Sequence, residues 1–320
     1  MNCPRLITLI VASLFIVSCV KTCVGIGELG SKERPLLFSL EGWHSDSDST
    51  AAFNAIQDCM EKSSGYRVGF EIYADPSAVV RSLKAKRAQF GLLDSISFVS
   101  EGLGQGLVPL YIVGENRDFA KRAVIVGSVA QNSRSFVDSS LHFSKSSWAL
   151  SLQKAHQGTF AYLTQDSAEG FLVPRHMMLD VGVLPDAAIF AGNWEVVEEL
   201  VRGDKVDMGV LSEEYIKQNW EIEEAKIGLA HDGVIILAIS PPFPKRVMAA
   251  NADLSTTTIN AITNGLMICA TGADRSAIEK TFSGVQFERA DLDDFAFLKE
   301  ITEFQRTFVR VLPENEPGMR

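Results

Sequence analysis

The sequence carries no excess of basic residues. Its 320 residues include 30 Lys and Arg against 40 Asp and Glu, which gives a formal net charge of −10. Proteins that bind nucleic acid usually carry a basic excess, because their lysines and arginines displace the counterions of the phosphates. The composition therefore argues against nucleic acid as a partner.

Motifs for metal binding and covalent catalysis are also missing. The five cysteines and five histidines form no CxxC pair and no HExxH motif, so no zinc site is predicted. There is no GxSxG motif, and Ser167 has no evident base beside it. A Ser/His/Asp triad can also be assembled from distant residues. On motifs alone, we expect no metal, no cofactor and no catalytic residue.

A glycine pattern near the N-terminus matches a dinucleotide-binding motif by spacing alone. Gly25, Gly27 and Gly30 give GxGxxG, but this motif binds a dinucleotide only between a strand and a helix. Here it follows an apolar leader and precedes the polar stretch 31–35. A tether explains these glycines better than a cofactor site.

No apolar run is long enough to cross a bilayer, which takes roughly 20 residues. Residues 6–17 form a shorter apolar run after Arg5, as is typical of a secretory signal. The run ends in Ile16-Val17-Ser18-Cys19, which resembles a bacterial lipobox. We expect residues 1–18 to be a signal peptide, Cys19 to carry a lipid anchor and residues 19–34 to be a tether. The alternative is an ordinary signal peptide with an incidental cysteine.

Cys59 and Cys269 are the cysteines that remain for the folded body. In an oxidising compartment they can form a disulfide. Two single cysteines can equally be small buried hydrophobic residues. The sequence leaves both interpretations open.

From Pro35 onward, apolar runs alternate with segments of helical spacing. Candidate strands are 36–40, 66–73, 90–93, 108–113, 123–127, 159–163, 187–190, 206–211 and the region 225–239. Candidate helices are 50–63, 77–86, 169–179, 194–202, 213–222, 256–271, 275–282 and 295–309, with Ser77 and Asn193 as expected caps. This alternation predicts α/β layers around a mostly parallel sheet.

Four stretches of this region resemble one protein family in their order and spacing. They are 74–95, 166–175, 191–207 and 240–244. The second is similar to a Ser-Thr-Ser-Gly-aromatic-Leu-x-Pro segment, and the fourth reads Ser-Pro-x-x-Pro. The family is that of the phosphonate-, phosphite- and phosphate-type periplasmic solute-binding proteins of ABC transporters, and the resemblance covers residues 35–310.

The resemblance implies an α/β, bilobed type 2 periplasmic-binding-protein fold, with two α/β lobes joined by two crossing strands. Residues 35–125 and 230–320 would form one lobe, and residues 126–229 the other. It also implies a receptor that binds a small solute between its lobes, closes about a hinge and delivers the solute to an ABC permease. We expect an exported monomer on the periplasmic or cell-surface side, held at a membrane by its lipid.

Ligands of such folds bind at strand ends and helix N-termini. With the resemblance, this predicts ligand-binding roles for Trp43, His44, Asp94, Ser95, Ser167, Glu169, Trp194, Glu214 and Arg246. Structural alternatives stand beside these roles. Glu169 is also a favourable acid for the first turn of a helix, Asp94 a helix cap and Trp194 a core residue. Trp43 and His44 can lie in the core or at the surface, and the Lys245-Arg246 pair can be solvated.

The residues with which the family binds an anion are largely replaced. The hydroxyl triplet reads Ser167-Ala168-Glu169, the family's tyrosine falls on Leu93, its histidine on Trp194, and a usual glycine is Asp94. Two like charges about 4 Å apart repel by about 4 kcal/mol at an effective dielectric constant of about 20. A dianion beside Glu169 and Asp94 is therefore disfavoured.

The remaining replacements favour a positively charged ligand over an anion. An aspartate of the family is replaced by Lys245 or Arg246, whereas an acid that contacts the ligand amine in aminophosphonate binders is retained as Glu214. We expect an amine-containing or otherwise non-phosphonate solute. The alternative is a sensory or surface lipoprotein that reuses the fold without transport.

Overall fold

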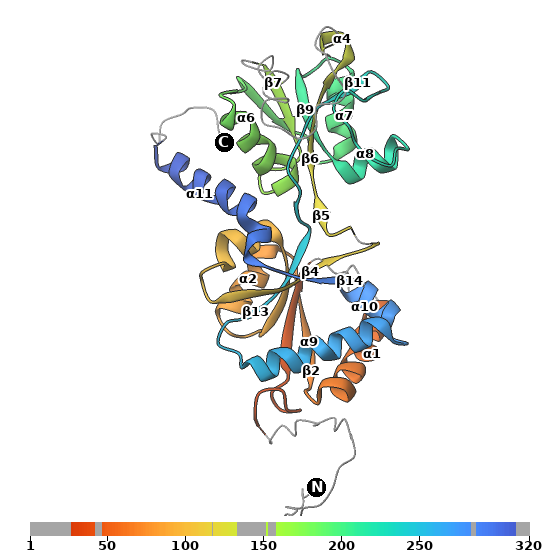
Figure 1. The fold of residues 1–320 in the computed structure, drawn as a ribbon, viewed down its shortest axis with the longest axis vertical. Coiled ribbons are helices and arrows are strands. Elements are labelled where there is room, and N and C mark those ends of the chain that lie inside the picture. Colours follow the sequence, from red (N-terminus) through yellow and green to blue (C-terminus); the bar gives the residue numbers. More distant parts are fainter. Residues whose placement is uncertain are drawn as a thin grey trace, which may run out of the picture.

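Two sheets organise the chain. The computed structural model describes residues 27–41, 47–116, 118–132, 152, 158–282 and 286–311. These residues build two six-stranded sheets with helices packed on them, and a two-stranded ladder between the sheets. We call the unit around the sheet that contains β1 the first lobe and the unit around the other sheet the second lobe. They lie one above the other, with β5 at the junction (Figure 1).

The sheet of the first lobe has the strand order β14-β4-β13-β3-β1-β2. Its strands are β1 (Leu36–Glu41), β2 (Val68–Tyr73), β3 (Phe90–Asp94), β4 (Leu107–Gly114), β13 (Arg246–Asn251) and β14 (Gln286–Arg289). Its helical segments are α1 (Ser47–Ser64), α2 (Pro76–Lys84), α3 (Ser95–Ser97), η1 (Phe98–Gly102), α9 (Thr256–Thr271), α10 (Arg275–Phe282), η4 (Leu292–Phe295) and α11 (Ala296–Val311).

The sheet of the second lobe has the strand order β10-β11-β6-β9-β7-β8. Its strands are β6 (Ala123–Ser128), β7 (Thr159–Tyr162), β8 (Ala187–Phe190), β9 (Met208–Ser212), β10 (Ala230–His231) and β11 (Val234–Ile239). Its helical segments are α4 (Val129–Asn132), η3 (Ala168–Leu172), α6 (Val173–Asp180), α7 (Trp194–Arg202) and α8 (Glu213–Asn219).

Two short strands lie where the chain passes between the lobes. β5 (Ala120–Lys121) leads up to β6, and β12 (Phe243–Pro244) leads back from β11; the two pair antiparallel. β11, which the expected division assigns to the first lobe, is hydrogen-bonded within the second sheet. The return crossing thus lies between Ile239 and Arg246. The division of the chain into two folding units stays a prediction.

The prediction of mostly parallel sheets is wrong, because both sheets are mixed. β1 pairs parallel with β2 and β3, and β7 with β8 and β9, whereas β13 runs antiparallel to β3 and β4, and β6 antiparallel to β9 and β11. The physical reason is the double crossing. A strand that enters a sheet from the junction runs opposite to the strands that end there.

In both sheets, the edge at which the parallel strands end faces the junction between the lobes. In the first lobe, β1, β3 and β4 end beside the start of β13, since Arg246 pairs with Asp94 and Val113. In the second lobe, β7 and β9 end beside the start of β6, since Ala123 pairs with Ser212. Loops at the carboxyl ends of strands therefore meet from both sides of the crossing segments.

One hydrophobic core continues from the first lobe into the second. It contains Leu83 of α2, Tyr162 of β7, Phe243 of β12 and Leu298 of α11, all at most 3% exposed. The first-lobe helix α11 packs on η1, α3 and the second-lobe helix α6. Separate cores fill the outer parts of the two lobes.

A disulfide joins Cys59 of α1 to Cys269 of α9, with the Cα atoms 6.0 Å apart. It decides between the two alternatives that the sequence left open. The bond spans 210 residues of sequence, and α1 and α9 pack directly on one another. It therefore fixes a helix pair drawn from both ends of the chain.

Local signals explain several helix starts. Asn193 caps α7 as expected, by accepting a hydrogen bond from the Val196 amide at 2.8 Å. The cap of α2 is Asp75 rather than Ser77, because the Asp75 carboxylate accepts from the Ala78 amide and Pro76 occupies the first turn. Among the described helices, none has the length and apolar character of a membrane span.

Candidate functional site

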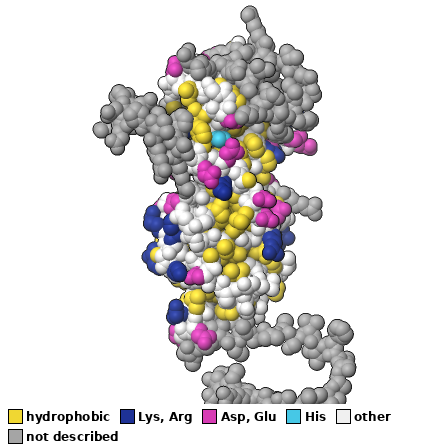
Figure 2. Space-filling model, turned by 60° about the vertical axis from the view of Figure 1, so that its left-hand side comes forward, with side chains coloured by type: hydrophobic (Ala, Val, Ile, Leu, Met, Phe, Trp, Pro, Cys, Tyr) yellow, Lys and Arg dark blue, Asp and Glu magenta, His cyan; other side chains and the backbone are white. Residues whose placement is uncertain are grey.

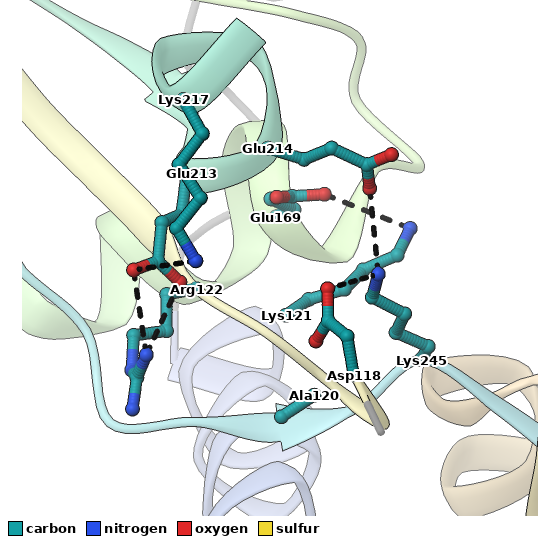
Figure 3. Close-up of a pocket in the computed structure, with 9 residues that line it drawn as sticks. All are labelled: Asp118, Ala120, Lys121, Arg122, Glu169, Glu213, Glu214, Lys217 and Lys245. Carbon is teal, nitrogen blue, oxygen red and sulfur yellow. Dashed lines mark hydrogen bonds and ion pairs between the residues drawn. The ribbon is translucent and has the colours of Figure 1, made fainter. Parts of the chain in front are cut away.

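A charged pocket lies beside the two crossing segments, against the second lobe (Figure 3). Its cavity volume is about 40 Å³, and it opens to solvent. The side chains come from the crossing segments, from the start of η3 and from α8. They are Asp118, Ala120, Lys121, Arg122, Glu169, Glu213, Glu214, Lys217 and Lys245.

Glu169 reaches the pocket because a helix begins directly before it. The Ser167 hydroxyl caps η3 by accepting from the Gly170 amide at 2.8 Å, and the helical run continues through α6 to Asp180. A Cβ atom at Gly170 would collide with Leu163, so this first turn packs closely on the end of β7. Glu169 thus stands at the positive end of the helix, where an external anion would otherwise bind.

Burial and neighbouring charges set the ionisation of Glu169. The residue is 8% exposed, and its Oε2 atom lies 3.6 Å from Lys121 Nζ. Burial raises the pKa of Glu169 to about 7, while Lys121 opposes this rise and Glu214 adds to it. Near neutral pH the site can therefore hold or release a proton.

Lys245 forms a second ion-pair centre at the other crossing segment. Its Nζ atom lies 2.7 Å from Asp118 Oδ2 and 3.5 Å from Glu214 Oε2. Burial lowers the pKa of Lys245, but Asp118 and Glu214 outweigh this effect, and the pKa lies above its ordinary value. Lys245 therefore stays charged and ties the crossing segments to α8.

A third centre surrounds Glu213. Its carboxylate lies 3.1 Å from Arg122 Nη1 and 3.4 Å from Lys217 Nζ. Together the three centres contain four cationic and four anionic side chains, and each of the eight has at least one ion-pair partner among the others. When Glu169 is ionised, the pocket is therefore electrically balanced by its own residues.

The facing edge of the first lobe carries a smaller set of charges. Glu41 ends β1, and Asp94 ends β3 opposite Arg246 of β13. Burial raises the pKa of Glu41, the nearby Asp94 raises it further, and Arg246 and Lys121 lower it. A positive charge of the crossing segment is thus felt by acids on both sides of the junction.

The expected ligand-binding residues fall into distinct settings. Glu169 and Glu214 line the pocket. Asp94 caps α3 by accepting from the Ser97 amide at 2.9 Å, and the buried Ser95 hydroxyl donates to the Pro244 carbonyl oxygen of β12. Arg246 is exposed at the first-lobe edge.

Of the remaining expected residues, some make structural contacts and some lie outside the part of the chain that the structure describes. The Ser167 hydroxyl caps η3, and Trp194 packs against both the shared core and the outer core of the second lobe. Trp43 and His44 lie outside the described residues, as do the expected signal peptide and Cys19.

Sequence reasoning missed the pocket residues of the first crossing segment. Asp118, Lys121 and Arg122 belong to a charged stretch, 115–122, that stands between the apolar strands β4 and β6. Such a stretch looks like a solvated loop. The available signal is its placement between the two lobes, because a crossing segment must pass the edges at which the strands of both sheets end.

The fold and the paired edges define the class of two-lobed solute-binding proteins. XAC2383 from Xanthomonas citri bound to ATP has a TM-score of 0.62 at 15% identity, over 87% of this chain and 99% of that one. PhnD1 from Prochlorococcus marinus in complex with methylphosphonate has a TM-score of 0.56 at 17% identity, over 85% and 98%. These likenesses confirm the predicted bilobed type 2 periplasmic-binding fold. No curated protein matches the sequence.

The sequence itself shows which family this protein belongs to. Residues 39–295 match the family model of phosphonate periplasmic substrate-binding proteins of ABC transporters. The protein belongs to this family, as the four motifs predicted. Its members are the periplasmic, substrate-binding components of ABC transporters.

Replacement of Glu169 by Gln should change how stability depends on pH. The folded protein keeps the Glu169 proton up to about pH 7, whereas the unfolded chain releases it near pH 4.5. Stability contributed by this raised pKa is complete below pH 4.5 and is lost as the pH rises to 7; it amounts to about 3 kcal/mol. Urea unfolding at four pH values should therefore show a smaller decline for Glu169→Gln than for the wild type. Glu224→Gln, at an exposed acid, is the control, and parallel wild-type and Glu169→Gln curves would refute the account.

Proposed function

We propose that this protein is the solute receptor of an ABC-type importer and that it binds its solute at the junction of the lobes. The observation that carries this proposal is the arrangement of the strand ends. Loops from both sheets meet beside a charged pocket at two crossing segments. Membership of the family supports the transport role, and a two-stranded connection is suited to hinge closure.

The solute we propose carries an ammonium group or another positive charge. In this pocket the helix end that would attract an anion is already neutralised by the buried Glu169. A phosphonate dianion would meet the carboxylates of Glu169 and Glu214 there. A cation would instead be attracted to both carboxylates.

A second candidate is a surface or sensory lipoprotein without transport. The specific observation in its favour is the charge balance, since every charged side chain that lines the pocket already has an ion-pair partner. Such a protein would bind no small solute at this pocket. The binding experiment below separates the two candidates.

Thermal unfolding with a panel of solutes tests the solute class. Tetramethylammonium, putrescine, methylphosphonate and phosphate are added separately to the mature protein. A ligand at about 100 times its dissociation constant stabilises by about 2.7 kcal/mol, which raises the melting temperature by about 4 °C in a chain of this size. We expect this rise with the cations, at least a tenfold loss of affinity in Glu169→Gln, and no loss in the exposed control Glu224→Gln.

Other outcomes of this panel are equally clear. A rise with methylphosphonate and none with the cations would refute the cationic solute and leave the receptor. No rise with any solute would favour the lipoprotein without transport.

We also propose that the protein is exported and held at a membrane through lipid on Cys19. The lipobox supports the anchor, and the Cys59–Cys269 disulfide supports an oxidising compartment. In cells that express the full chain, Cys19→Ser should move the protein from the carbonate-washed membrane fraction to the soluble fraction. Equal partitioning of wild type and variant would contradict the anchor, and Cys23→Ser is the matched control.

A further inference from the structure

Lys121 and Glu169 form an unequal ion pair. Glu169 is 8% exposed on a helix of the second lobe, whereas the Lys121 side chain is 40% exposed and belongs to the crossing strand β5. Figure 3 shows the Lys121 ammonium group extending from the crossing segment toward the Glu169 carboxylate. The carboxylate is fixed in place by the helix, but the ammonium group can turn out into water.

The positive charge of Lys121 also affects an acid of the first lobe. Its positive charge acts on Glu41, at the end of β1, where it opposes the effects of burial and Asp94. A flexible lysine on the crossing strand thus has acids on either side of it.

We propose that Lys121 is a tethered cation that occupies the solute's position at Glu169, so that a cationic solute binds by displacing it. This inference rests on the proposed function. It makes Lys121 a specificity-determining residue of that same pocket. The lysine screens solutes, because a cation must offer more contacts than the resident ammonium group before it replaces it.

The physical reason is competition for one carboxylate. Two ammonium groups near the same carboxylate repel one another, and the partly buried position screens this repulsion less than bulk water does. Binding therefore requires that the lysine move away. Lys245 differs, because two acids, Asp118 and Glu214, hold it at 2.7 and 3.5 Å. Of these two pocket lysines, Lys121 is therefore held less strongly.

The inference predicts a gain of affinity when Lys121 is removed. Binding of tetramethylammonium is measured by calorimetry at pH 9, which lies above the pKa of Glu169, about 7 in the wild type. The probe is chosen because its charge does not depend on pH. Lys121→Met should bind about tenfold more tightly than the wild type, which is what relief from one charge-assisted contact is worth.

Matched variants guard against indirect effects. Lys226→Met removes a lysine that lies 3.6 Å from Glu224, the same distance as in the Lys121–Glu169 pair, but both groups are exposed. It should bind the probe as the wild type does. Lys121→Gln is the second variant if Lys121→Met does not fold, and Lys121→Met combined with Glu169→Gln should lose the gain.

The outcomes separate this inference from the proposed function. If the wild type binds the probe and Lys121→Met binds it equally or more weakly, Lys121 is a structural ion-pair partner and the inference is wrong by itself. If a folded Lys121→Met binds no cation at all, Glu169 is not a cation site, and the inference fails together with the proposed solute class. Tighter binding that persists after Glu169→Gln would also contradict it.

Discussion

The buried carboxylate of Glu169 is the feature on which the electrostatics of the junction depends. It stands in the first turn of η3, where backbone amides favour negative charge, and Lys121 faces it from the crossing strand. The family is that of phosphonate substrate-binding proteins, whereas this chain supplies a negative group of its own at that helix end. The charges of the surrounding ion pairs then balance. The face of the molecule in Figure 2 likewise carries both acidic and basic side chains.

The crossing segments link this electrostatic arrangement to the mechanics of the fold. β5 and β12 pair with one another. Lys121 of β5 and Lys245, directly after β12, form ion pairs with acids on η3 and α8 of the second lobe. The buried core runs through the same junction and includes Leu298 of α11. A change in hinge angle therefore disturbs both ion pairs and packing, so displacement of Lys121 by a solute would couple binding to closure.

Much of the fold could be predicted because its signals are local. The bounds of β8, α7, α9 and α10 agree with the pattern of apolar residues, and the four motifs predicted the family. The sheet order and the Lys121–Glu169 contact could not be predicted, since they depend on long-range pairing across the crossing. Ser95 and Asp94 are predicted ligand-binding residues. Their side chains bond to the Pro244 carbonyl oxygen of β12 and to the Ser97 amide of α3, and their ligand role stays a prediction. Short-range hydrogen bonding by such residues is common at strand ends.

The most direct test of the account is the ionisation of Glu169 itself. Carbon NMR of side-chain carboxyl groups, with the Glu169 signal assigned by its absence in Glu169→Gln, follows this one group through pH. The account predicts a midpoint near pH 7 that moves to lower pH when tetramethylammonium is added, because a cation favours the ionised form. A midpoint near pH 4.5 that the cation leaves unchanged would contradict it.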